Sequence, residues 1–174
     1  MESKALYVMA GYDDETEKYL AGIQNKLYEQ GFVGRHTKNI PQHITLGSFP
    51  VEKEKELKEM FQKLSETQLS FEISFNHVGI FGGSNVLFIA TDSNKELLEL
   101  KEKFGESFGW TPHTTMLIDE PEVVLKALPI VLKEFMSFEG KVTTLHLYEF
   151  WPTRHVLSVQ LKESFVNNDV GINK

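Results

Sequence analysis

The chain has 174 residues, of which 41% are hydrophobic and 25% are charged, and its formal net charge is −7. This length and composition fit one globular domain and exclude a disordered chain. The lack of cysteine excludes disulfides, thiolate metal sites and a cysteine nucleophile. The acidic balance argues against a binder of long duplex nucleic acid, because such proteins gain most of their affinity from Lys and Arg contacts to phosphates.

Targeting signals are not evident in the sequence. The polar start lacks the basic and apolar regions of a signal peptide, and no apolar run approaches the ~20 residues that cross a bilayer. We therefore expect a cytoplasmic monomer without membrane contacts.

In chain order, the first predicted elements are a strand and an acidic-capped helix. The strand covers residues 5–11. The helix begins at Asp13 or Asp14, reaches about Gln30 and is stopped by Gly31.

Two strands and a second helix follow. A short strand is predicted over residues 32–36 and a clearer one over 43–49, which Pro50 closes. The helix over residues 52–66 carries one apolar stripe at i, i+3, i+4 and i+7.

The middle of the chain predicts a hairpin and a third helix. Apolar and polar residues alternate over residues 69–81, and a glycine-containing turn at 81–85 leads into a strand over 86–90. A capping box at Ser93 opens a helix that we expect to reach about Phe108.

The last part predicts a strand over residues 112–118, a helix from Pro121 to about Phe135, and an antiparallel pair over 140–150 and 156–161. The polar tail over 167–174 is expected to fray.

One short motif occurs twice, and it is the most informative feature of the chain. His43-Ile44-Thr45 and His113-Thr114-Thr115 each follow a proline, open a predicted strand and come after a predicted helix. The repeated order of helix, proline, motif, strand and helix indicates an internal duplication. We expect an α+β fold with two similar lobes, in which antiparallel sheets face each other across a cleft and helices pack outside.

The spacing within each motif points to acid–base chemistry. Residues i and i+2 of a strand share a face, so each histidine projects with its threonine. With a pKa near ~6.5, one imidazole can be neutral and the other protonated near neutral pH, as general base and general acid at one phosphorus centre. The threonine hydroxyls would hold the non-bridging oxygens.

On these motifs the sequence resembles the two-histidine (2H) phosphoesterases, which include the 2′-5′ RNA ligase-like proteins and cyclic nucleotide phosphodiesterases. The resemblance covers nearly the whole chain, although Thr114 replaces the usual apolar residue of the second motif. It implies a bilobal α+β fold with His43 and His113 as the catalytic pair and Thr45 and Thr115 as phosphate ligands. It also implies action on 2′,3′-cyclic or related cyclic phosphates, or on 2′-5′ linkages. The sequence leaves open which histidine is the base.

Three further residues are candidates for substrate binding. Arg154 lies in a predicted loop and can contact a phosphate, or it is a solvated loop arginine. Trp110 can stack on a base, or it is a core aromatic. Tyr12 ends the first predicted strand and can line the cleft.

The main chemical alternative to this interpretation is a metal site, but no histidine or carboxylate cluster has ligand spacing. We therefore expect no metal and no cofactor. The leading hypothesis is a metal-independent phosphodiesterase acting on a nucleotide cyclic phosphate or an RNA terminus. RNA 2′-5′ ligation and nucleotide binding without turnover are the alternatives.

Overall fold

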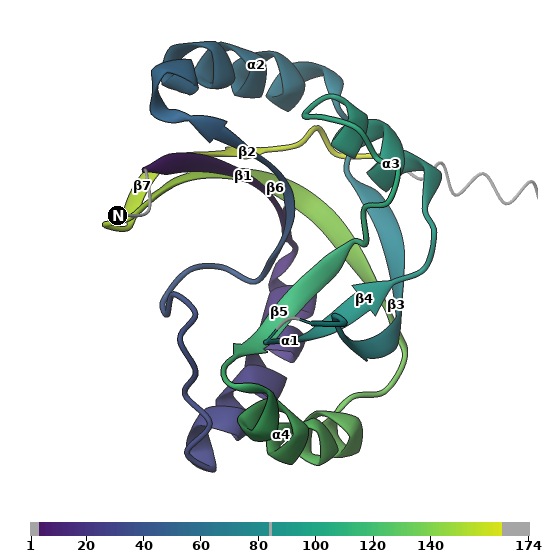
Figure 1. Ribbon diagram of the computed structural model, residues 1–174. Helices are drawn as coiled ribbons and strands as arrows, with labels where there is room; N and C mark the ends of the chain where they lie inside the picture. The colour runs from purple at the N-terminus through teal and green to yellow at the C-terminus, as the bar shows by residue number, and fades with distance from the viewer. Residues whose placement is uncertain (1–3, 84, 165–174) are drawn as a thin grey trace, which may run out of the picture.

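In the computed structural model, which describes residues 4–83 and 85–164, the strands form one antiparallel sheet (Figure 1). The strand order is β2-β1-β6-β3-β4-β5, and β7 pairs with β6. The strands are β1 (Ala5–Tyr12), β2 (His43–Pro50), β3 (Phe71–Ile80), β4 (Val86–Thr91), β5 (His113–Ile118), β6 (Phe138–Phe150) and β7 (Arg154–Gln160). The predicted tail over 167–174 lies outside the described residues.

The long strand β6 joins the two halves of the sheet. Its first part pairs with β3, from Phe138 to Val142, and its remainder pairs with β1 as far as Phe150. The expected α+β class with antiparallel strands is confirmed. The strands of both halves belong to one continuous sheet because the 13 residues of β6 are enough to pair with both.

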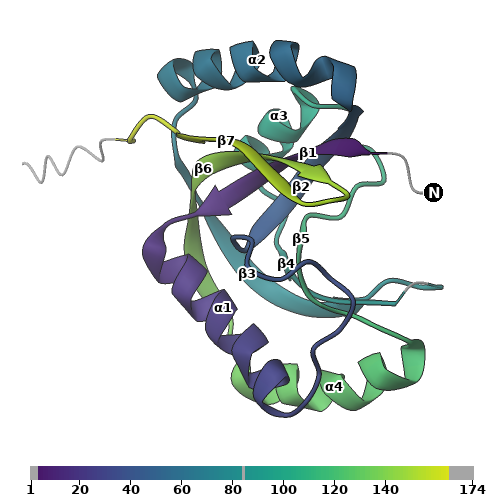
Figure 2. The ribbon, with the colours of Figure 1, turned by 90° about the vertical axis from the view of Figure 1, so that its left-hand side faces the viewer.

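The helices lie in two pairs at opposite ends of the curved sheet (Figures 1 and 2). They are α1 (Asp14–Glu29), α2 (Glu54–Thr67, after a 3₁₀ turn at Val51–Lys53), α3 (Lys95–Glu102) and α4 (Pro121–Glu134). At one end α2 contacts β7 and α3 contacts β2, while at the other α1 contacts β5 and α4 contacts β4. Thus α1 contacts β5 of the second half as well as β1 and β6, and α3, which follows β4, contacts β2 of the first half.

The core follows the predicted periodicity. The alternating residues Phe71, Ile73 and Phe75 of β3 are buried, and so are Leu57 and Phe61 on the apolar stripe of α2. They belong to one hydrophobic cluster that also takes in buried residues of the other strands and helices. At ~25 cal/mol per Å² of apolar area removed from water, this cluster supplies the main favourable term in folding.

The helix caps are largely as predicted. Asp13 is the N-cap of α1 and accepts the Thr16 N–H at 3.0 Å, and Pro121 occupies the first turn of α4. For α3, however, the N-cap is Asn94 instead of Ser93, because the Asn94 side chain accepts the Leu97 N–H at 2.9 Å.

Two sequence expectations about element boundaries are wrong. The segment 32–36 is not a strand, because Gly34 has a φ of +63° that interrupts extended pairing. Its backbone instead docks on β5 through one hydrogen bond, from the Arg35 N–H to the Ile118 carbonyl at 2.7 Å. Helix α3 ends at Glu102, well short of Phe108, and Gly105 follows with a φ of +138°.

Candidate active site

The two His-x-Thr motifs begin strands β2 and β5, the two ends of the strand path. Because the sheet curls, these two strands contact one another although they are far apart in the strand order. The motif strands are irregular at matching places: the pairing register skips one residue at Leu46 in β2 and at Met116 in β5, each three residues after its histidine. A matched pair of bulges therefore follows the two motifs.

The alternation within each motif is as expected. Ile44 and Thr114 are buried in the protein, whereas His43, Thr45 and Thr115 are partly exposed on the other face. The face that carries each histidine therefore also carries its threonine, as the period of a strand requires.

Both imidazoles are fixed in the same way. The Nδ1 atom of His43 lies 2.8 Å from the Pro41 carbonyl oxygen, and Nδ1 of His113 lies 2.8 Å from that of Thr111. A carbonyl oxygen only accepts, so each Nδ1 carries a proton and donates it. In the neutral ring Nε2 is then unprotonated, and in the charged ring it is a donor, which is what a general base and a general acid require.

The environment favours the neutral form of both rings. Burial lowers the pKa of His43, the Pro41 carbonyl opposes this, and the charge of His113 lowers the pKa further. Burial also lowers the pKa of His113, against the effect of the Thr111 carbonyl. The charge of His113 thus acts on the His43 imidazole, so the two rings are close enough to interact electrostatically.

Aromatic rings pack against His113. Phe81 meets its imidazole edge-on with centroids 4.8 Å apart, and Phe88 lies 5.3 Å away. Gly79 makes room for this arrangement, since a Cβ there would lie 2.5 Å from the Phe88 ring. The two phenyl rings restrict the orientation of the imidazole.

A cavity of about 260 Å³ adjoins the motifs. Three of the four predicted catalytic residues line it, namely His43, Thr45 and Thr115, and His113 begins the same strand as Thr115. The remaining walls come from β1, α1, β5, β6, the 30–42 connection and the turn after β6: Tyr7, Met9, Gln24, Arg35, His36, Thr37, Ile40, Pro41, Gln42, Thr114, Ile118, Phe150 and Trp151.

Two partly buried amide side chains, those of Gln24 and Gln42, connect the first motif to the second. The Gln42 side chain donates to Gln24 Oε1 at 2.7 Å, and Gln24 Nε2 donates to the Met116 carbonyl at 3.0 Å. The Gln42 N–H is accepted by the Glu17 carboxylate at 2.9 Å, and burial raises the pKa of Glu17. The Glu17 and Gln24 side chains of α1 thus hold Gln42, the residue before His43, against the strand of His113. In the sequence, nothing beyond helical periodicity marks these two positions.

The structure places two of the predicted substrate-binding residues outside the cavity wall, in supporting positions. Tyr12 is buried, and its hydroxyl lies 2.6 Å from Thr114 Oγ1. Trp110 packs against the core, and its indole N–H donates to the Thr45 carbonyl at 3.3 Å. Tyr12 thus contacts a side chain of the second motif, and Trp110 contacts the backbone of the first.

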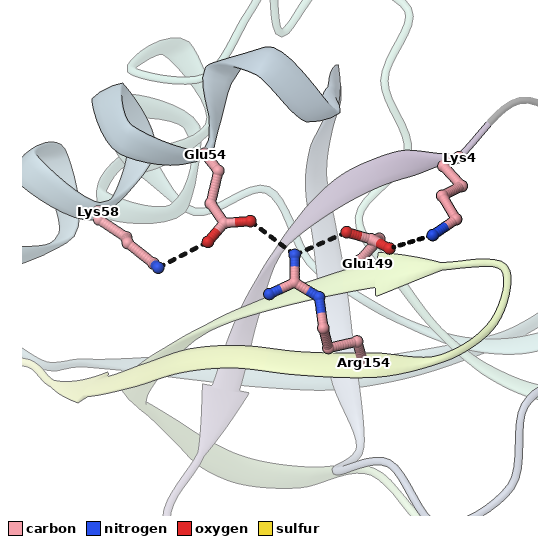
Figure 3. Close-up of polar contacts among 5 residues, drawn as sticks. All are labelled: Lys4, Glu54, Lys58, Glu149 and Arg154. Atoms are coloured by element: carbon pink, nitrogen blue, oxygen red, sulfur yellow. Dashed lines mark hydrogen bonds and ion pairs between the residues drawn. The ribbon is translucent and has the colours of Figure 1, made fainter.

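Arg154, the third predicted substrate-binding residue, does not line the cavity and belongs to an ion-pair network (Figure 3). Its Nη2 lies 2.6 Å from Glu54 of α2 and 2.6 Å from Glu149 of β6. Lys58 and Lys4 extend the network at its two ends. Hydrogen bonds from Arg154 and then Lys58 lower the pKa of Glu54 to about 2. The arginine begins β7, shares its Nη2 between these two carboxylates and is not among the residues that line the cavity.

The cation that does line the cavity is Arg35, from the 30–42 connection. Its guanidinium also pairs with Glu120, on the exposed side of the connection. Within residues 4–83 and 85–164, no three His, Asp or Glu side chains are grouped so as to hold a metal ion. No helix in the described part of the chain is long and apolar enough to cross a membrane.

The fold and the paired motifs are those of a two-histidine phosphoesterase, and the sequence comparison agrees. The chain matches the 2′-5′ RNA ligase superfamily over residues 12–151 and belongs to that superfamily. No curated protein sequence matches the chain.

Solved structures share the fold. Escherichia coli LigT in complex with 3′-AMP has a TM-score of 0.61 and 20% identity over 92% of this chain and 99% of LigT. LigT in complex with ATP has a TM-score of 0.60 and 20% identity, with 93% and 99% coverage. The protein TT0787 of Thermus thermophilus has a TM-score of 0.60 and 14% identity, with 92% and 100% coverage.

Proposed function

We propose that the protein is a phosphodiesterase that opens 2′,3′-cyclic or related cyclic phosphates of nucleotides or RNA ends without a metal ion. The observation that carries this proposal is the matched anchoring of the two imidazoles. With both Nδ1 atoms held by carbonyls at 2.8 Å, both Nε2 atoms are free to exchange protons with a shared substrate.

In the proposed hydrolysis, His43 is the general base and His113 is the general acid. A water oxygen attacks phosphorus while its proton passes to Nε2 of His43. The bond from phosphorus to one ring oxygen breaks, and that oxygen takes the proton from Nε2 of His113. The assignment rests on the more complete burial of His43 and on the neighbouring charge of His113, which both keep His43 neutral.

The threonines and Arg35 would hold the phosphoryl group. Thr45 and Thr115 line the cavity beside the histidines, and their hydroxyls can donate to the non-bridging oxygens. Arg35 supplies the positive charge that an acidic protein needs locally to attract an anion. The LigT complexes with 3′-AMP and ATP support a nucleotide-sized substrate for this fold.

The decisive experiment measures hydrolysis of adenosine 2′,3′-cyclic phosphate by the purified protein with EDTA present. The same assay is run on ADP-ribose cyclic phosphate and on RNA with a cyclic-phosphate end. We expect turnover and a bell-shaped dependence of kcat/KM on pH, since one imidazole must be free and the other protonated. Binding of these compounds without turnover would replace the proposal with that of a nucleotide-binding protein, and loss of turnover with EDTA would replace it with metal catalysis.

RNA 2′-5′ ligation is a second candidate, because the superfamily to which the chain belongs carries that description. The same groups serve if an RNA hydroxyl attacks in place of water. Incubating RNA with a 2′,3′-cyclic phosphate end and RNA with a free 5′ hydroxyl, then analysing joined products, separates ligation from hydrolysis.

A further inference from the structure

A second group of histidines lies on the sheet beside the first motif. His146 of β6 stands opposite Met9 of β1, which lines the cavity, and opposite Ser158 of β7. Its Nδ1 atom lies 2.6 Å from Ser158 Oγ, and Nε2 of His155 lies 2.8 Å from the same oxygen. The serine hydroxyl thus bridges two imidazoles.

The ring of His146 reaches across β1 toward the first motif. A Cβ atom built on Gly11 would lie 2.4 Å from Nε2 of His146 and 2.7 Å from its Cδ2, so the ring occupies the space that the glycine leaves open. Gly11 pairs directly with His43 on the neighbouring strand β2. With Nδ1 held by Ser158, the free Nε2 atom is the part of His146 nearest to the catalytic histidine's strand.

The charge state of this ring limits what it can bind. Burial, with contributions from the charges of His43 and His155, lowers the pKa of His146 to about 4. The ring is therefore neutral at pH 7 and offers no positive charge to a phosphate. It can act only through a hydrogen bond at Nε2.

The bridging serine allows the His146 ring to bind a hydroxyl group in either of its neutral tautomers. Ser158 Oγ has one proton, so it donates to one imidazole and accepts from the other. If it donates to His146, Nε2 presents an N–H; if it accepts from His146, Nε2 presents a lone pair. A hydroxyl group, which both donates and accepts, is satisfied by either state.

We propose that His146 contacts the bound product: it hydrogen-bonds the sugar hydroxyl that ring opening releases next to the phosphate, after His113 has protonated that oxygen, with Ser158 as its positioning residue. This deepens the proposed function and rests on it for the identity of the substrate. Opening of a 2′,3′-cyclic phosphate leaves one phosphate and one hydroxyl on neighbouring carbons. His43 and His146 would then face these two neighbouring positions.

The test is a binding experiment that does not need turnover. Dissociation constants are measured by calorimetry for 3′-AMP and for 2′-deoxyadenosine 3′-phosphate, which lacks only the hydroxyl. The isomeric pair, 2′-AMP and 3′-deoxyadenosine 2′-phosphate, is measured in the same way. For the wild type we expect one hydroxyl-bearing nucleotide to bind about 3- to 10-fold tighter than its deoxy partner, as one net hydrogen bond between neutral groups gives.

The variants locate the origin of that difference. His146→Ala should bring the two members of the pair to equal affinity, and His146→Gln, whose amide reaches the place of Nε2, should restore part of the difference. Ser158→Ala should reduce it without abolishing it. Inorganic phosphate should bind all four proteins equally, because the neutral ring does not contact the anion.

The outcomes separate this proposal from the proposed function. A hydroxyl preference that survives unchanged in both His146→Gln and His146→Ala, or a wild type with no preference in either nucleotide pair, overturns the role of His146. If His146→Ala does not fold, the Gln and Ser158→Ala variants decide. A hydroxyl preference lost with His146, in a protein that turns over no cyclic phosphate, supports the contact and overturns the phosphodiesterase assignment alone.

Discussion

The Tyr12 hydroxyl lies 2.6 Å from Thr114 Oγ1, a buried contact between residues 102 positions apart in the sequence. Thr114 stands between His113 and Thr115, and Tyr12 ends the strand that pairs with His43's strand. The contact therefore links the second motif to the strand that pairs with the first motif, on the buried side of both strands. Burial raises the pKa of Tyr12, so its hydroxyl keeps its proton over the whole working pH range.

Tyr12→Phe should destabilise the protein by about 1–3 kcal/mol, because it leaves the buried Thr114 hydroxyl without its partner. Urea unfolding of Tyr12→Phe, Thr114→Val and the double variant forms a double-mutant cycle. We expect the double variant to be less destabilised than the sum of the single ones. Strict additivity of the two free-energy changes would show that the contact contributes nothing.

Replacing either catalytic histidine should remove most of the activity while the fold persists. Since one proton transfer contributes ~10²–10⁴-fold, His43→Ala and His113→Ala should each lower kcat by at least about 10²-fold. His77→Ala, at an exposed histidine of β3 paired with Asp92, is the matched control and should retain full activity. Circular dichroism confirms folding of all three, and full activity in either catalytic variant would remove that residue from the mechanism.

The strands and helices were predictable because their apolar periods are strong. The alternation in β3, the stripe of α2 and the N-cap of α1 are local properties, and the structure confirms them. The turn and helix-end errors at 32–36 and near Phe108 have a different origin. Both follow from glycine backbone conformations, at Gly34 and Gly105, that local apolar patterns do not report.

The motif residues could be identified because a repeated motif is visible in the sequence. The residues that hold the motifs in place could not be identified in this way. Gln24 and Gln42 meet only because α1 packs across to β5, so nothing along the chain reports their bond. Arg154 and Arg35 show the same limit. The sequence places both arginines near the ends of predicted strands or in loops. Only their neighbours in the folded protein determine which one reaches the cavity.

Arg35→Ala and Arg154→Ala form a matched pair that tests this distinction. Loss of the cavity cation should raise KM about 10- to 100-fold, the effect of one charge-assisted hydrogen bond, with a smaller change in kcat. Arg154→Ala should leave KM unchanged and lower stability, since Glu54 and Glu149 lose their shared partner. Steady-state kinetics with a cyclic nucleotide gives the first result and thermal unfolding the second. A raised KM in Arg154→Ala alone would mean that the ion-pair network opens to bind substrate.

Stability should fall as the pH is lowered from 6.5 toward 4.5. The pKa values of His43, His113 and His146 are lowered in the folded protein, mainly by burial, and that of His146 to about 4. Unfolded histidines titrate near ~6.5, so in this window the unfolded chain binds more protons than the folded one. Above pH ~6.5 the contribution of these histidines to stability is complete. Below it, each histidine that stays neutral in the folded protein lowers the free energy of unfolding by up to about 1.4 kcal/mol per pH unit.

Urea unfolding of the wild type and His146→Gln at pH 7.5, 6.5, 5.5 and 4.5 measures this slope. The variant should lose less stability on acidification, because glutamine takes up no proton in either state. The raised pKa of Glu17 acts with the opposite sign, but it is the same in both proteins and cancels from their difference. The lowered pKa values of Glu54 and Glu149 act only near and below ~4.5, at the lower edge of the window. Identical slopes for the two proteins would mean that His146 takes up its proton at the same pH in the folded protein as in the unfolded chain, and the lowered pKa assigned to it would be wrong.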